Sequence, residues 1–129
     1  MPQHIAAVAL LVPEYDEAIS YFCGVLDFEL VEDTRLDADK RWVLVRPRGS
    51  GGTALLLARA ASDEQRKRIG DQGGGRVLLF LHTDDFDTDH VRYSAAGVRF
   101  TGAPRREPYG TVAVFEDPFG NRWDLIEPA

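Results

Sequence analysis

The sequence predicts an α+β fold made of two tandem β-α-β-β-β modules, at about residues 1–58 and 77–129. In each half an apolar run of strand length leads through an aromatic turn into an amphipathic helical segment, and alternating segments typical of strands follow. The turns at residues 12–16 and 83–87 occupy equivalent places in the two halves. A repeat of this length indicates two copies of one supersecondary unit, whose open sheets must each bury one face.

The elements of the first module follow from its hydrophobic pattern. Residues 4–12 form an apolar run that ends at Pro13, which is typical of a buried strand. Asp16 is the expected N-cap of the next segment, whose apolar residues recur at helical spacing until Asp27 ends the helix. Alternation and turn-forming residues then predict three strands, over residues 28–34, 41–46 and 53–58.

Residues 59–76 are expected to connect the modules. Their polar part, residues 62–69, predicts a short helix capped by Ser62 or Asp63. The triple glycine at residues 73–75 lacks both the Gly-Lys-Ser/Thr ending and the spacing of a phosphate-binding loop, so we interpret it as a linker.

The second module repeats the plan. Residues 77–83 predict an apolar strand, residues 88–96 a helix that ends at Gly97, and residues 98–100 the start of a further strand. Residues 102–107 are expected to form a loop.

The C-terminal stretch, residues 111–126, predicts a β-hairpin. Its strands alternate and are rich in β-branched and aromatic residues, and DPFGN at residues 117–121 supplies the turn chemistry. Because strand side chains alternate between faces, Asp124 shares a face with Arg122 and Ile126. Asp124 is therefore a carboxylate set between large apolar residues near the end of a strand.

The composition is that of an ordinary globular protein, since 44% of the 129 residues are hydrophobic and 28% are charged. A net charge of −6 argues against a nucleic-acid partner, which would need a basic face. The single cysteine, Cys23, excludes an internal disulfide, and its apolar neighbours favour a buried, inert thiol in a reducing compartment. No signal peptide or membrane-spanning run is evident, so we expect a cytoplasmic protein with no membrane partner.

Four motifs, taken in order, carry a family resemblance beside the repeat itself. They are VPEYDEAISYF at residues 12–22, FLHTDDFD at residues 80–87, AGV at residues 96–98 and DPFGNRWDL at residues 117–125. Together they resemble the vicinal oxygen chelate (VOC) superfamily, which includes glyoxalase I, bleomycin-resistance proteins, fosfomycin-resistance enzymes and extradiol dioxygenases. The resemblance covers nearly the whole chain as a single VOC domain, and it implies two modules forming a curved sheet around a cavity, commonly completed in a homodimer.

The resemblance also implies where a metal would bind. Metal-dependent members draw one ligand from the first strand and one from the last strand of each module. Carried over by spacing, these positions are Ala7, Leu56, Leu78 and Asp124. Three of the four have no ligand atom, and one aspartate cannot hold a divalent ion, so we expect neither a metal nor another cofactor.

The three histidines do not restore a metal site in this interpretation. His4 lies three residues before Ala7, so its side chain is expected on the opposite face of the strand. His82 lies at the far end of its strand, and His90 is expected to be exposed on a helix. A surface histidine, or one with its hydrogen bonds satisfied, is the favoured interpretation for each, since a metal site needs several converging ligands.

Without a metal, the cavity itself is the predicted functional feature. A mostly apolar wall with a few polar groups is the usual composition of a small-molecule pocket, although the same residues can simply be core. Trp42 and Tyr109, like Trp123 and Phe119, can stack on a planar ligand. A charged aspartate there, balanced by Arg122 or His82, would favour a cationic ligand. The predicted cavity residues are Ala7, Trp42, Leu56, Leu78, Phe80, His82, Tyr109, Arg122 and Asp124.

Three classes of function remain open from the sequence. The empty ligand positions favour a glyoxalase/bleomycin-resistance-like protein that binds a small molecule in a metal-free apolar cavity. The alternative is a lyase, isomerase or dioxygenase-like enzyme, either with an atypical metal site or with Asp124 and His82 as acid and base. The third is a catalytically silent regulatory or interaction module.

Overall fold

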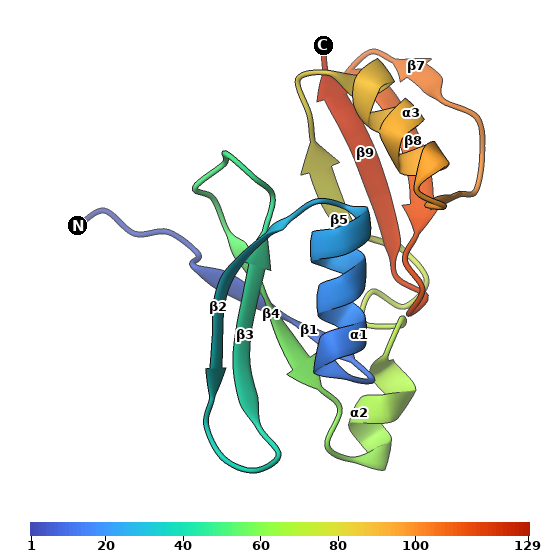
Figure 1. The fold of residues 1–129 in the computed structure, drawn as a ribbon. Coiled ribbons are helices and arrows are strands. Elements are labelled where there is room, and N and C mark those ends of the chain that lie inside the picture. Colours follow the sequence, from blue (N-terminus) through green and yellow to red (C-terminus); the bar gives the residue numbers. More distant parts are fainter. The chain divides into compact units, whose positions relative to one another are not determined.

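The computed structural model describes residues 1–129, and the chain divides into two compact units, residues 1–69 and 70–129. Each unit contains one open sheet with a helical segment packed on one of its faces, as Figure 1 shows. The predicted α+β class is confirmed. No helix is both long enough and apolar enough to cross a membrane.

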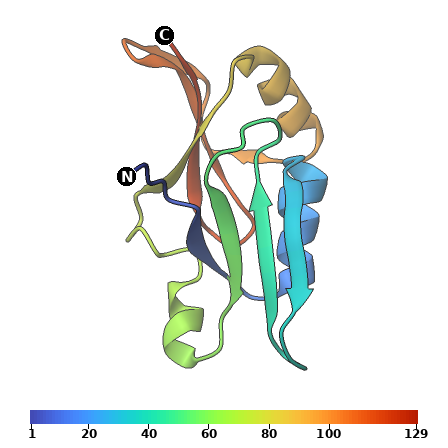
Figure 2. The ribbon, with the colours of Figure 1, turned by 90° about the vertical axis from the view of Figure 1, so that its left-hand side faces the viewer.

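In the first unit four strands lie side by side in the order β1 (Ala7–Val12), β4 (Ala54–Arg59), β3 (Arg41–Arg46) and β2 (Glu29–Arg35) (Figure 2). β1 runs parallel to β4, and the other neighbours are antiparallel. The parallel pair is what brings the first and last strands of the unit together.

One face of this sheet is covered by α1 (Tyr15–Ile19), which continues as a π-helix, η1 (Ser20–Val25). The helix turns Ala18 and Phe22 inward, and both are fully buried. Alternate residues of the strands form the sheet side of this core, namely Leu10, Val12, Val43, Val45, Leu55 and Leu57. The chain leaves the helix at Asp27, whose φ of 60° is a left-handed conformation that aspartate tolerates better than most residues.

α2 (Asp63–Arg68) follows β4 and confirms the short helix predicted there. The Ser62 hydroxyl caps it by accepting a hydrogen bond from the Gln65 backbone N–H at 3.1 Å. The Gln65 side-chain oxygen accepts in return from the Ala61 N–H at 2.8 Å, so two backbone donors at the helix start are satisfied.

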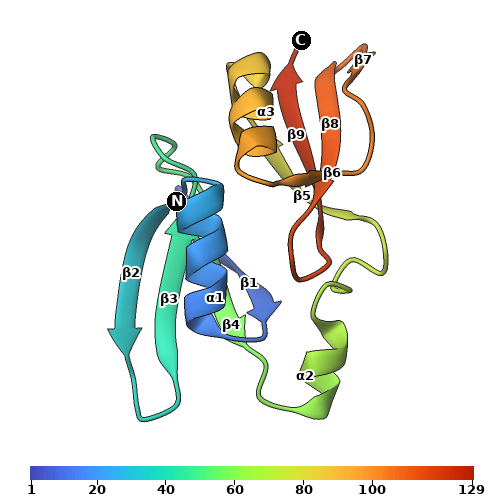
Figure 3. The same ribbon diagram turned by 45° about the vertical axis from the view of Figure 1, so that its right-hand side comes forward.

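The sheet of the second unit has the order β5 (Val77–His82), β9 (Arg122–Pro128), β8 (Gly110–Glu116) and β6 (Arg99–Phe100), and β7 (Arg105–Glu107) also pairs with β8. β5 runs parallel to β9, which repeats the arrangement of the first unit. α3 (Phe86–Ala95) packs on one face (Figure 3). Asp85 caps this helix by accepting from the Thr88 N–H at 3.2 Å.

Aromatic rings fill the space between α3 and its sheet. Phe115 is completely buried and stacks on Trp123, with ring centroids 5.5 Å apart. Tyr93 of α3 and Phe100 of β6 meet the same Phe115 ring edge-on. This face, with Ala113 and Leu125, is therefore the core of the second unit.

The DPFGN turn between β8 and β9 is held by Asp117, which is only 4% exposed. Its carboxylate accepts hydrogen bonds from the backbone N–H groups of Phe119 and Asn121, from the Asn121 amide and from the Trp123 indole N–H, at 2.9–3.1 Å. Four donors compensate the burial of this charge. The motif thus has a structural role: it fixes the hairpin and orients Trp123.

Several local predictions were wrong. β1 begins at Ala7 rather than residue 4. The N-cap position before α1 is held by Glu14, without a side-chain hydrogen bond, and Asp16 lies in the first turn. The expected loop at residues 102–107 contains β7, because its extended backbone finds a partner in β8. α3 begins two residues earlier than predicted, at Phe86.

Candidate functional site

Side-chain alternation leaves each sheet with one face that its helix does not cover. In the first unit Leu56 is the register partner of Ala9 in β1 and of Leu44 in β3. Ala7 and Trp42 lie two residues from those partners, so they share the helix-free face with Leu56. Trp42 is 39% exposed there. The structure therefore places these three predicted cavity residues on one surface.

The second unit has a corresponding surface opposite α3. Phe80 pairs with Asp124 across β5 and β9, and His82 pairs with Ile126, so these side chains share the helix-free face. Arg122, two residues before Asp124, lies on the same face and is exposed. Phe80 is unusually exposed for a large apolar side chain, at 61%.

Three other aromatic or apolar candidates lie elsewhere. Leu78 falls at the register shift between Val77 and Leu79, so a bulge separates it from the regular alternation. Tyr109 lies in the turn before β8 and is exposed. Trp123 is buried on the helix-covered face, so it cannot stack on a ligand at the helix-free surface.

Asp124 is the buried carboxylate of the helix-free face. Only 8% of the residue is exposed, and its Oδ1 atom has no hydrogen-bond partner. Its register partners, Phe80 and Val114, are both apolar. Burial raises the pKa of the Asp124 carboxyl, and the charge of Arg105 opposes part of that rise.

The cation near Asp124 is not one of those that the sequence indicated. Arg122 is exposed, and its guanidinium donates to the Gly75 carbonyl oxygen at 3.4 Å. Arg105, from β7, is the positive charge that acts on Asp124, and it also binds Glu107 at 3.0 Å. Sequence reasoning missed Arg105 because it lay in an expected loop.

This arrangement leaves the Asp124 carboxylate with an acceptor atom that the protein does not satisfy. A buried carboxylate with an unpartnered oxygen is costly, and the cost falls if the group takes up a proton or meets a donor. A ligand that brings an N–H or a positive charge to Oδ1 would supply what the protein does not.

The residues at the superfamily's metal positions do not fit a metal. Ala7, Leu56 and Leu78 offer no donor atom, and Asp124 lies between apolar register partners. Within either unit no group of three or more His, Cys, Asp or Glu side chains is placed to hold an ion. The donor set therefore lacks the several oxygen or nitrogen ligands that a divalent ion needs.

The histidines lie apart from one another. His4 precedes β1 and is exposed, and His82 is exposed at the end of β5. His90 is not the exposed residue that was expected, because its ring stacks on Phe86 and meets Phe100 at a tilt, with centroid distances of 5.5 and 4.3 Å. Its role is packing.

The first unit also contains a cavity that the sequence did not reveal. β3 and β4 are paired only at Leu44–Leu56 and Val45–Leu55, after which the strands separate. A cavity of about 560 Å³ lies at the separation, lined by Trp42 and Leu56 and also by residues of the β2–β3 turn and the start of α2. Tyr15 enters the gap from α1, and its hydroxyl accepts a hydrogen bond from the Arg41 backbone N–H at 3.2 Å.

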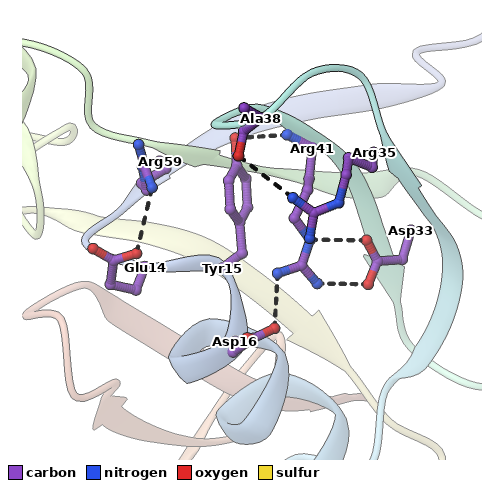
Figure 4. Close-up of polar contacts among 8 residues, drawn as sticks. All are labelled: Glu14, Tyr15, Asp16, Asp33, Arg35, Ala38, Arg41 and Arg59. Atoms are coloured by element: carbon purple, nitrogen blue, oxygen red, sulfur yellow. Dashed lines mark hydrogen bonds and ion pairs between the residues drawn. The ribbon is translucent and has the colours of Figure 1, made fainter.

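Two guanidinium groups flank the Tyr15 ring, as Figure 4 shows. The Cζ atoms of Arg41 and Arg59 lie 5.2 and 5.9 Å from the ring centroid, within range of a cation–π interaction. Arg41 is also bound by Asp33 through two hydrogen bonds, at 3.1 and 2.6 Å, and by Asp16 at 2.8 Å.

This cluster arises from strand separation and helix entry, which are tertiary features. The only signal in the sequence is the tyrosine of the aromatic turn after the first strand.

Comparison with known proteins places the chain among described families. The model of the Glyoxalase/Bleomycin resistance protein/Dioxygenase superfamily matches residues 4–125. An uncharacterized protein of Shewanella frigidimarina is 53% identical over 128 residues, covering 98% of this chain and 95% of that protein.

Two further similar proteins have described functions. The crystal structure of TnmS3, an antibiotic binding protein from a Streptomyces species, has a TM-score of 0.78 at 29% identity, covering 99% of this chain and 98% of that one. A 2-epi-5-epi-valiolone epimerase from an Actinomyces species is 26% identical over 140 residues, covering 92% of this chain and 76% of the epimerase.

Proposed function

The chain belongs to the glyoxalase/bleomycin resistance protein/dioxygenase superfamily, and on that premise we propose that it binds a small organic molecule without a metal ion. The observation that carries the proposal is the buried Asp124 carboxylate with its unpartnered Oδ1. The exposed Phe80 ring beside it offers a surface for a planar group. The similarity to an antibiotic-binding protein supports the same class of function.

The proposed ligand is an organic cation with an aromatic part. Its positive group compensates the Asp124 carboxylate, while its ring packs on Phe80. Because cation binding favours the ionised carboxylate, affinity should rise with pH through the raised pKa of Asp124.

The test is calorimetric titration of aromatic amines, beginning with naphthylmethylamine, into wild-type protein and Asp124→Asn. We expect Asp124→Asn to weaken binding about tenfold or more, since a hydrogen bond to a charged partner contributes ~1.5–3 kcal/mol. Asp71→Asn is the matched control, because Asp71 is an exposed aspartate of the same unit. Equal affinity in wild type and Asp124→Asn would remove the residue from the site.

The proposed absence of a metal ion is tested separately, by measuring the metal content of the protein. Protein purified without chelator should contain far less than one equivalent of nickel, zinc, iron or manganese by elemental analysis. A stoichiometric metal that survives dialysis would contradict the proposal.

A second candidate function is proton-transfer catalysis, favoured by the similarity to an epimerase. A carboxyl with a raised pKa is suited to exchange a proton with a carbon acid. Incubation of ligand hits in deuterium oxide separates the two functions. Asp124-dependent deuterium uptake into the ligand indicates an enzyme, and binding without uptake indicates a binding protein.

A further inference from the structure

We infer that the gap between β3 and β4 is a binding site for a planar aromatic acid, whose ring packs on Trp42 and whose carboxylate meets Arg59. This inference rests on the proposed function in so far as both describe a small-molecule-binding protein. It concerns residues of the first unit alone and a ligand of opposite charge.

The cavity passes between the two strands rather than lying on one face. Trp42, Leu56 and Ala58 belong to the helix-free face by strand alternation, whereas Leu57 and Tyr15 belong to the helix-covered side, yet all line the same space. A ligand can therefore lay one end on the helix-free face and pass the other between the strands. The volume of the cavity, about 560 Å³, is within the range of small-molecule pockets, ~300–1,000 Å³.

The side chains around the gap favour a flat ring. Trp42 leaves 39% of its surface exposed beside Leu56 and Ala58. An indole next to aliphatic groups offers both stacking and apolar contact to an aromatic ligand. Burying this exposed indole surface provides the hydrophobic part of the binding energy.

The anionic part of the ligand is selected by Arg59. Each nitrogen of the Arg41 guanidinium already donates one hydrogen bond, to Asp33 or to Asp16. Arg59, in contrast, has one ion pair, to Glu14, at 3.7 Å, which is too long for a hydrogen bond. Its side chain is 37% exposed, so a ligand carboxylate can reach the guanidinium and form two parallel hydrogen bonds.

The other charges that line the cavity are partly compensated or screened. Asp37 already accepts the backbone N–H groups of Asp39 and Lys40, at 2.8 and 2.7 Å, so its charge is partly compensated. Lys40 adds a positive charge to the lining. Asp39 is an exposed carboxylate at the rim, where water and salt screen its repulsion.

The experiment uses naphthoate as the probe, with naphthamide as its neutral isostere. We expect naphthoate to bind wild type, and Arg59→Gln to weaken it about tenfold while leaving naphthamide affinity unchanged. Arg48→Gln is the matched control, because Arg48 pairs with Asp27 outside the cavity and should bind naphthoate like wild type. Trp42→Ala should weaken both probes.

Two readouts guard against an effect on folding. Thermal unfolding of each variant shows whether it is folded. Arg59→Lys keeps the positive charge but cannot form two parallel hydrogen bonds with a carboxylate, so it should bind naphthoate with intermediate affinity. In heteronuclear NMR, naphthoate should shift the indole N–H of Trp42 and the side-chain amide of Gln65, but not the buried indole of Trp123.

The inference is overturned if naphthoate fails to bind, if naphthamide binds equally well, or if Arg59→Gln binds naphthoate like wild type. In each of those cases, Asp124-dependent binding of naphthylmethylamine would leave the proposed function standing. If neither naphthoate nor naphthylmethylamine binds, both the inference and the proposed function are overturned.

Discussion

At the scale of single residues, Asp124 and Asp117 show how differently a buried carboxylate can be used. Asp117 is surrounded by four donors and holds a turn, whereas Asp124 has an oxygen with no donor at all. Only the second is expected to limit stability, because its burial is not compensated within the protein.

The pH dependence of stability tests this directly. The folded-state pKa of Asp124 is raised above its ordinary value of 3.8, so the folded protein holds the proton more tightly than the unfolded chain. Its contribution to the free energy of unfolding is therefore largest at low pH and is lost as pH rises through the folded pKa. Asp124→Asn carries no charge and should be as stable as wild type near pH ~3.5 and more stable at neutral pH.

Urea unfolding of wild type and Asp124→Asn across this pH interval measures the difference. Asp71→Asn, at an exposed position, should track wild type throughout. A wild-type advantage over Asp124→Asn that grows with pH would show that the carboxylate is better compensated than its surroundings indicate.

At the scale of elements, the backbone of the turn between β8 and β9 packs closely against Gly70. A Cβ added at Gly70 would lie 2.2 Å from the Phe119 carbonyl oxygen, and its φ of 75° already disfavours a side chain. Gly74 has a similar φ of 65° with open space around it. Substitution of Gly74 therefore tests backbone strain alone, whereas substitution of Gly70 adds a steric clash to that strain.

We expect Gly74→Ala to lower the free energy of unfolding by ~1 kcal/mol through strain alone, and Gly70→Ala by ~3 kcal/mol or more. Chemical denaturation of both variants checks this. Equal losses would mean that the turn moves away from Gly70 without cost.

The elements that local pattern decides were predictable. β3 was predicted with its observed bounds because a short apolar run rich in β-branched and aromatic residues lies between Arg41 and Arg46. β7 was missed because its pairing depends on β8, and the π-helix was missed because its apolar stripe also fits an α-helix. Asp124 could be named from the sequence through alternation and resemblance. Tyr15 and Arg59 could not, since no local pattern records that β3 and β4 separate.

At the scale of the whole molecule, large apolar side chains remain on the surface of the single chain. Ile5 is 68% exposed, Val8 48% and Phe80 61%. Exposed apolar surface is typical of interaction sites, and members of this superfamily commonly form homodimers.

We therefore expect a homodimer in solution. Light scattering coupled to size-exclusion chromatography should give twice the mass of one chain at micromolar concentration, and Ile5→Glu/Val8→Glu should lower it towards one. Arg66→Glu/Lys67→Glu, on the exposed surface of α2, is the control and should leave the mass unchanged. The mass of one chain for wild type would contradict the expectation.

The parallel pairing in each unit also bears on the order in which its strands can pair during folding. The strand synthesised last, β4 or β9, lies in the interior of its sheet, between β1 and β3 or between β5 and β8. A growing chain can close the β2–β3 hairpin early, but β3 then presents an unpaired edge until β4 arrives to fill the space between it and β1. β4 follows β3 after a short loop, so the edge of β3 is soon covered. β1, in contrast, stays unpaired until β4 has been made, and this parallel, non-local pairing forms slowly compared with a hairpin. The incomplete β3–β4 pairing, which stops after two positions, lies on the opposite edge of β4 from this slow pairing.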